Sequence, residues 1–267
     1  MLRPRIIPCL LIHKGGLVKT QVFKSPKYVG DPINAVKIFN EKESDELMVL
    51  DIDATVNCVE PNYSLIAKLA AECRMPLTYG GGVNSVEHAK RIIDLGVEKV
   101  AISAAAVTNP RLVTSIAQAI GRQSVVVVLD VRKKSGLLAK GYELCTHNAK
   151  TTHKLDPVSF AKSLQEAGAG EIVVNSVDRD GLMNGYDLDI AEQVFESLRV
   201  PMTMLGGAGS LQDIALLVRK CGVVGAAAGS LFVFKGKYRA VLINYPTVEQ
   251  KEEILSAAVS PLIIHHP

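Results

Sequence analysis

Two stretches of this chain, ELMVLDID at residues 46–53 and EIVVNSVD at residues 171–178, lie 125 positions apart and read as copies of one another. The same shift places Pro76 on Pro201 and the glycine pair 81–82 on the pair 206–207. A self-similarity of this period indicates a duplicated supersecondary unit. Each copy is long enough for about four strands with their connecting helices.

Short apolar runs recur along the chain, as expected for strands that are buried on both faces of a parallel sheet. Amphipathic stretches separate these runs, and this alternation predicts crossover helices. The eight runs cover residues 5–12, 47–52, 76–79, 99–103, 124–130, 171–176, 201–205 and 223–228.

The length of 267 residues suits one α/β domain, a single (β/α)₈ TIM barrel built from two similar half-barrels. A Rossmann sheet is disfavoured, because no G-x-G-x-x-G motif follows the first strand. The predicted barrel spans residues 1–255, and residues 256–267 form a C-terminal tail with no assigned role. Helix-capping side chains are expected at Asn84, Asn109 and Asp156, the last two followed by proline.

Composition excludes several classes of protein. The formal net charge is only +3, far from the dense basic patches that are typical of nucleic-acid-binding proteins. Five widely spaced cysteines without a C-x-x-C pair predict neither a metal site nor a disulfide framework. No apolar run is long enough to span a membrane, and the first apolar run is too short for a signal peptide. The cytoplasm is therefore the expected compartment.

The carboxyl ends of barrel strands normally carry the active site, and glycines follow three of the predicted strands there. Such glycines let backbone N–H groups face an anion, with help from the next helix terminus. Gly207, Gly229 and Ser230 predict one phosphate site, and Gly82 with Ser103 predicts its counterpart across the mouth. The alternative is that these glycines only form tight turns.

Acidic residues also end several strands. Asp130 follows VVVVL and is a candidate general acid or base, although it could instead orient the following loop by a hydrogen bond. That loop, residues 131–155, is a candidate flexible loop or hairpin over the mouth. One or more of Asp51, Asp178 and Asp180 is expected to fix loop geometry. Lys19 either reaches the mouth or is an ordinary solvated lysine.

Taken together, these features resemble the cyclase subunit of imidazole glycerol phosphate synthase over residues 1–235. The resemblance depends on RIIPCL, GDP (30–32), DEL with LDI, PLTYGGGV, KVAIS with AAV and NP, AGAGEI, DRDG with GYD, and GGAG. It implies a (β/α)₈ barrel that receives ammonia from a glutaminase subunit and cyclises a bis-phosphorylated precursor. It implies no metal and no redox cofactor.

The resemblance also implies an acid–base pair of aspartates at the ends of the first and fifth strands. Asp130 matches the second of them, but Leu11 stands where the family has the first. Leucine cannot transfer a proton, and loss of one such group costs roughly 10²–10⁴-fold in rate.

The phosphate positions implied by the resemblance are only partly kept. Ser103-Ala104 replaces the Asn-Thr of the family after the fourth strand. The other matching positions for ligand binding, catalysis or loop geometry are Lys19, Gly82, Asp180, Gly181, Gly207, Gly229 and Ser230. The phosphate site in the C-terminal half therefore looks intact, and the site in the N-terminal half looks weakened.

At the opposite end of the barrel, the resemblance implies an ammonia gate made of four charged residues: Arg5, Glu46, Lys99 and Glu171. Glu98 and Gln123 match positions at the glutaminase interface. Buried charges are costly unless they are paired. A paired quartet could alternatively serve only to plug the barrel.

The chain keeps all four gate residues at the base of the barrel but lacks one of the two catalytic aspartates at the mouth. In this combination it resembles a diverged branch of the family that is associated with amidation of surface-glycan sugars. The leading hypothesis is a subunit that receives ammonia from a glutaminase and supports a separate sugar amidotransferase. The second is a working cyclase of histidine biosynthesis, in which Asp51 or Asp53 replaces the missing acid. The third is a non-catalytic subunit that activates its glutaminase.

Overall fold

The computed structural model describes residues 3–136 and 139–259, and these form a closed barrel of eight parallel strands. The strands are β1 (Arg5–His13), β4 (Leu47–Asp51), β5 (Leu77–Gly80), β6 (Lys99–Ile102), β7 (Val125–Lys133), β10 (Glu171–Ser176), β11 (Met202–Leu205) and β12 (Gly225–Ala228). Pairing of β1 with β12 and of β7 with β10 closes the circle. The predicted (β/α)₈ barrel is confirmed.

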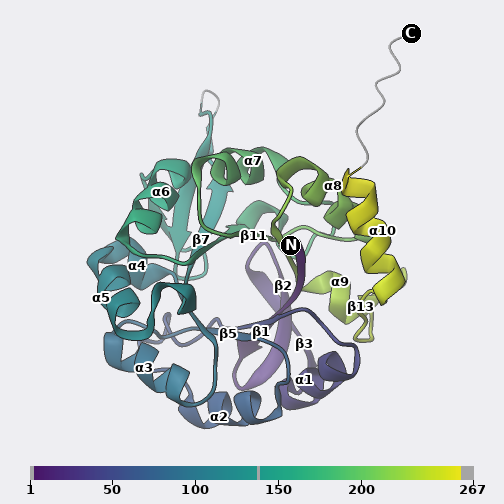
Figure 1. Cartoon of the computed structure of the whole chain (residues 1–267), viewed down its shortest axis with the longest axis horizontal. Coiled ribbons are helices and arrows are strands. Elements are labelled where there is room, and N and C mark those ends of the chain that lie inside the picture. The colour runs from purple at the N-terminus through teal and green to yellow at the C-terminus, as the bar shows by residue number, and fades with distance from the viewer. Residues whose placement is uncertain (1–2, 137–138, 260–267) are drawn as a thin grey trace.

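A ring of helices surrounds the strands (Figure 1). The helices are α1 (Pro32–Glu41), α2 (Tyr63–Glu72), α3 (Val86–Asp94), α4 (Ala104–Thr108), α5 (Arg111–Ile120), α6 (Pro157–Ala167), α7 (Leu188–Ser197), α8 (Leu211–Cys221), α9 (Ser230–Val233) and α10 (Val248–Val259). Within the described ranges, no helix is both long and apolar enough to cross a membrane. The expected boundary at residue 255 lies within α10, and residues 260–267 lie outside the described residues.

Helix starts were predicted with mixed success. The Asp156 carboxylate accepts a hydrogen bond from Ser159 N at 2.8 Å, as its sequence context predicts. The Asn84 prediction is wrong by one residue, because Ser85 caps α3 through the His88 amide. The Asn109 prediction is also wrong. Asn109 ends α4, and no side-chain capping bond precedes α5.

Two antiparallel hairpins extend the barrel at its carboxyl end. β2 (Gly16–Gln21) and β3 (Lys24–Gly30) follow β1, and β8 (Tyr142–Thr146) and β9 (Thr151–His153) follow β7. Of the two alternatives for the 131–155 insert, a flexible loop or a hairpin, the structure has the hairpin; residues 137–138 of the insert lie outside the described residues. β1 and β7 open the two halves of the chain, so the hairpins occupy corresponding places in the repeat.

The core has two parts. The larger part lies between the strands and the helices, and the smaller part fills the barrel interior. The interior residues are Ile7, Cys9, Met48, Ala101, Val126, Val128, Val173, Leu205 and Ala227. All the barrel strands except β5 therefore bury apolar residues on both faces, which explains their largely apolar sequences. This interior separates the mouth from the base of the barrel.

Candidate functional site

A cavity of about 500 Å³ opens at the carboxyl ends of the barrel strands. Apart from Asp53, offered as a replacement acid, it collects the residues that the sequence analysis considered for catalysis or phosphate binding, together with Leu11. These residues are Lys19, Gly82, Ser103, Asp130, Asp180, Gly181, Gly207, Gly229 and Ser230. A cavity of this size that combines apolar walls with convergent polar groups is typical of a ligand site.

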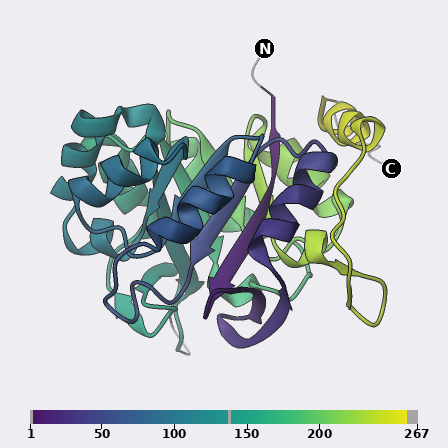
Figure 2. The same cartoon turned by 90° about the horizontal axis from the view of Figure 1, so that it is seen from below.

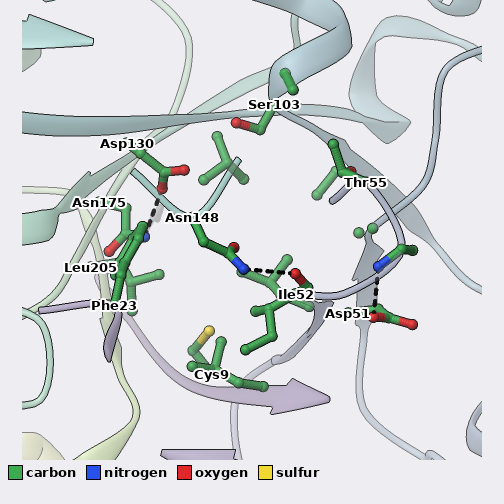
Figure 3. A pocket seen from close by; sticks show the side chains of 18 of the residues that line it. Cys9, Phe23, Asp51, Ile52, Thr55, Ser103, Asp130, Asn148, Asn175 and Leu205 are labelled. Atoms are coloured by element: carbon green, nitrogen blue, oxygen red, sulfur yellow. Dashed lines mark hydrogen bonds between the residues drawn. The ribbon is translucent and has the colours of Figure 1, made fainter. Parts of the chain in front are cut away.

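Asp130, near the carboxyl end of β7, presents its carboxyl group to the cavity (Figure 3). The Asn175 amide donates a hydrogen bond of 2.8 Å to Asp130 Oδ1. Desolvation raises the pKa of Asp130 to about 7, against the stabilising effect of that bond, and the nearby charge of Asp180 adds to the rise. A carboxyl group with a pKa near neutral pH is suited to proton transfer in either direction.

Leu11 occupies the corresponding place on β1. It pairs with Val18 of β2 and packs, together with Leu50, against the apolar interior of the barrel. Both leucines line the cavity. The wall of the cavity formed by β1 therefore presents a side chain without acid–base chemistry.

Lys19 on β2 does reach the mouth and is only 5% exposed. Its amine donates a 2.5 Å hydrogen bond to the carbonyl oxygen of Cys9. Burial lowers the pKa of Lys19, although the Cys9 thiol and Asp180 oppose this effect. The amine also lies against Gly229, where an added Cβ would meet Nζ at 2.7 Å. Lys19 thus stands beside one of the glycines proposed to bind phosphate.

The other acidic residues at the mouth fix loops. Asp51 Oδ1 accepts hydrogen bonds from the amides of Asp53 and Ala54, and desolvation raises its pKa. Asp178 accepts one from the amide of Lys133, and Asp180 accepts one from Thr20 Oγ1. These bonds agree with the structural role expected of this group.

Asp53 does not line the cavity. Its carboxylate contacts His13 Nδ1 at 2.7 Å and accepts a hydrogen bond from the amide of Lys14 at 2.8 Å. It therefore ties the turn after β1 to the loop after β4. Of the two aspartates considered as replacements for a missing acid, only Asp51 faces the site.

The glycines at the mouth have conformations that side chains would strain. Gly82 and Gly207 have φ values of +73° and +106°, in the region that favours glycine. An added Cβ would also collide with the carbonyl oxygen of Val59 at Gly82, and with that of Gly185 at Gly207. The Gly82 amide donates to Thr55 Oγ1 at 3.3 Å. Tight turns therefore explain part of the glycine pattern.

Sequence reasoning missed Asn148. It lies on the tip of the β8–β9 hairpin, and its side-chain amide donates a 3.0 Å hydrogen bond to the Ile52 carbonyl across the mouth (Figure 3). His147, Asn148 and Ala149 all have φ between +55° and +59°. Such a run of left-handed residues without glycine is uncommon and marks a strained turn. No sequence signal beyond the position of the insert pointed to it.

At the base, Arg5, Glu46, Lys99 and Glu171 form one closed ring of alternating charges. Arg5 contacts Glu46 at 2.6 Å and Glu171 at 2.9 Å. Lys99 contacts Glu46 at 3.1 Å and Glu171 at 2.9 Å. The structure brings the four predicted residues together, three at the first position of a strand and Glu46 just before β4.

The ring is electrically balanced and partly buried. Desolvation alone would raise the pKa of Glu171, but Arg5 and Lys99 outweigh it and lower that pKa. Thr203, which is fully buried, donates a further 2.6 Å hydrogen bond to Glu171. The mutual pairing offsets the cost of removing these charges from water.

Glu98 and Gln123 are both exposed at the base. The Glu98 carboxylate also accepts a hydrogen bond from the Leu77 amide at 2.7 Å. Both residues are placed where a partner could reach them, and their role in an interface stays a prediction.

Fold and site together define a (β/α)₈ barrel with an acid-bearing, glycine-rich mouth and a charged ring at its base. Residues 5–239 match the family described as histidine biosynthesis protein, and the chain belongs to this family. The sequence-based resemblance is thus confirmed for the family as a whole. The narrower assignment to a glycan-amidation branch stays a prediction.

Curated relatives cover nearly the whole chain. A protein of Vibrio vulnificus is 55% identical over 96% of this chain and 97% of its own length. A protein of Leptospira interrogans is 53% identical over 95% of this chain and 99% of its own length. A protein of Pseudomonas aeruginosa is 52% identical over 94% of this chain and 98% of its own length. Each bears the name "Putative imidazole glycerol phosphate synthase subunit".

Proposed function

We propose that this chain is a synthase-type subunit that takes ammonia from a glutaminase at its base and supplies it, through its barrel, to the amidation of a glycan sugar by a separate amidotransferase. The observation that carries the proposal is the contrast between the two ends of the barrel. The base has a complete ring of four paired charges, whereas the mouth has Asp130 but leucine at position 11.

The base suits a small neutral solute. The ring lies at the base of the barrel, and the interior beyond it is lined by apolar and small side chains such as Ala101 and Ala227. Transfer from water into that interior costs ions a large hydration free energy, and it costs neutral ammonia much less. Passage requires one ion pair of the ring to open, and Lys99 has the simplest geometry for this because it holds each glutamate by a single contact.

The mouth suits binding more than cyclisation. Gly207, Gly229, Ser230 and Lys19 support an anion site in one half of the cavity, and Gly82 with Ser103 supports a second, weaker one. Cyclisation by a pair of acids would need a second carboxyl group near Asp130. Leu11 cannot provide it, so the proposed barrel holds a phosphorylated small molecule without completing the ring closure.

The second candidate is a working cyclase of histidine biosynthesis. The names of the relatives favour it, and so does Asp51, which lines the cavity with a raised pKa. Rescue of a histidine auxotroph that lacks its cyclase separates the candidates. Growth that depends on Asp51 supports the cyclase, and no growth despite good expression supports ammonia delivery.

A non-catalytic subunit that activates its glutaminase is the third candidate. It predicts release of ammonia to solvent without a further protein. Co-purification from the native host tests this, because recovery of both a glutaminase and a larger sugar-modifying synthetase contradicts the stand-alone version.

A further inference from the structure

β1, which begins with Arg5, and β4, which Glu46 directly precedes, are not joined by ladder bonds at the base. The β1–β4 register begins at Cys9 and Met48, several residues inside the barrel. Below that point, the Ile6 amide donates instead to the side chain of Asp45, with a distance of 2.9 Å to Oδ2. A side chain thus replaces a strand partner where the ring is formed.

Tyr245 supplies the second link. Its hydroxyl group donates to the Ile6 carbonyl at 2.8 Å and accepts from the Asp45 amide at 3.0 Å. Ile6 directly follows Arg5, and Asp45 directly precedes Glu46. One phenol oxygen therefore bridges the backbones beside two neighbouring members of the ring, whose side chains are 2.6 Å apart.

The tyrosine is itself held in place. It is 8% exposed and packs against Phe232 with ring centroids 5.5 Å apart. Lys251 on α10 lies over the Tyr245 ring, 5.3 Å from its centroid, and pairs with Asp45 Oδ1 at 2.9 Å. Figure 2 shows α10, the yellow helix, at the same end of the barrel as the N-terminus, which is the end that carries the ring.

We propose that Tyr245, supported by Asp45 and Lys251, is a positioning residue for the charged ring. It fixes the separation of the starts of β1 and β4, and so holds Arg5 and Glu46 in contact. Tyr245 and Lys251 lie beyond residue 239, where the family match ends, so the segment after the matched barrel sets the geometry of the ring. The value of this device for ammonia transfer rests on the proposed function.

The same contacts would also exist if Tyr245 merely anchored the C-terminal segment. The two roles differ in what happens to Arg5 when only the hydroxyl oxygen is removed. An anchor held mainly by apolar packing against Phe232 would leave the ring unchanged. A positioning residue would loosen it, because the Ile6 carbonyl and the Asp45 amide lose their shared partner.

The test is Tyr245→Phe in the full chain, with Tyr238→Phe as the matched control. Tyr238 lies just before the end of the family match, a short distance upstream of Tyr245, and is 91% exposed. In ¹⁵N spectra, hydrogen exchange of the Arg5 guanidinium and the Asp45 amide should quicken at least about fivefold in the Tyr245 variant, because the variant loses both hydrogen bonds of the hydroxyl group and the net loss of even one is worth roughly that factor. Exchange in the control should match the wild type. Unchanged Arg5 exchange in Tyr245→Phe, with or without a lower melting temperature, overturns the proposal.

Lys251→Met provides a second variant in case Tyr245→Phe folds poorly. It removes the ion pair to Asp45 but keeps the length of the side chain. A smaller increase in Arg5 exchange is expected. No increase would count against the supporting role proposed for Lys251. With the glutaminase subunit added, Tyr245→Phe should also release more glutamine-derived ammonia to solvent than wild type. If wild type and variant release it equally while Arg5 exchange still differs, the proposed ammonia route fails and the positioning role stands.

Discussion

Leu11 and Asp130 occupy matching places in the two halves of the barrel. Each lies near the carboxyl end of the strand that opens its half, each pairs with the first strand of an antiparallel hairpin, and both line one cavity. The duplicated architecture is therefore retained while the chemistry of the two places differs. One half offers a titrating carboxyl group and the other offers a hydrocarbon.

Leu11→Asp should restore cyclisation if only the second acid is missing. Turnover of the bis-phosphorylated precursor with ammonia should then rise by roughly 10²–10⁴-fold over wild type. Leu50→Asp is the matched control, because it places a carboxylate in the same cavity from the neighbouring strand. An equal gain in both variants would mean that the place on β1 has no special geometry.

Asp130 should make the stability of the protein depend on pH. Its pKa of about 7 in the folded state exceeds the value of about 4 expected in the unfolded chain. Between these values the folded state binds more protons, so the free energy of unfolding falls as pH rises, by at most about 1.4 kcal/mol per pH unit.

Urea unfolding from pH 4 to pH 8 checks this linkage. Asp130→Asn should lose that part of the pH dependence, whereas Asp189→Asn, at an exposed position on α7, should follow the wild type. Parallel curves for Asp130→Asn and wild type would show that the carboxyl group titrates normally.

Breaking the ring at the base should destabilise the fold. Glu171→Gln leaves Arg5 and Lys99 with excess positive charge in a partly buried place, at a cost of about 3 kcal/mol. Lys220→Met, which removes the surface pair with Glu192, should cause no measurable change. Equal stability of the two variants in chemical denaturation would mean that the ring is solvated.

The Asn148 bond should hold the β8–β9 hairpin over the mouth. Asn148→Ala removes the bond to Ile52 and should speed amide hydrogen exchange across the hairpin tip, with a loss of only about 1 kcal/mol in global stability. Lys150→Ala, at an exposed position in the same turn, is the control. Identical exchange in the two variants would show that the contact does not restrain the hairpin.

The sequence was sufficient for the barrel, because closure depends on eight apolar runs and on the repeat that relates Glu46 to Glu171. It was also sufficient for the two clusters. The carboxyl ends of parallel strands meet at one end of a barrel and their amino ends at the other, so the strand positions of Asp130 and Lys99 placed them at opposite ends.

The sequence was insufficient for contacts that depend on loops. Asn148 reaches Ile52 only because a hairpin of unpredicted shape crosses the mouth, and Tyr245 reaches Ile6 across 239 positions. Neither residue follows one of the eight strands expected from the sequence or belongs to a periodic pattern. The cap at Ser85 was missed because Asn84 and Ser85 are both good capping residues, and the backbone geometry decides between them.

The central claim is that the barrel admits ammonia but does not complete cyclisation. The most direct measurement is the steady-state turnover of the histidine-pathway precursor by the full wild-type chain together with its glutaminase, with glutamine consumption followed in parallel. The account predicts steady glutamine hydrolysis with little or no imidazole glycerol phosphate formed. Formation of imidazole glycerol phosphate at a rate matching glutamine consumption would contradict it.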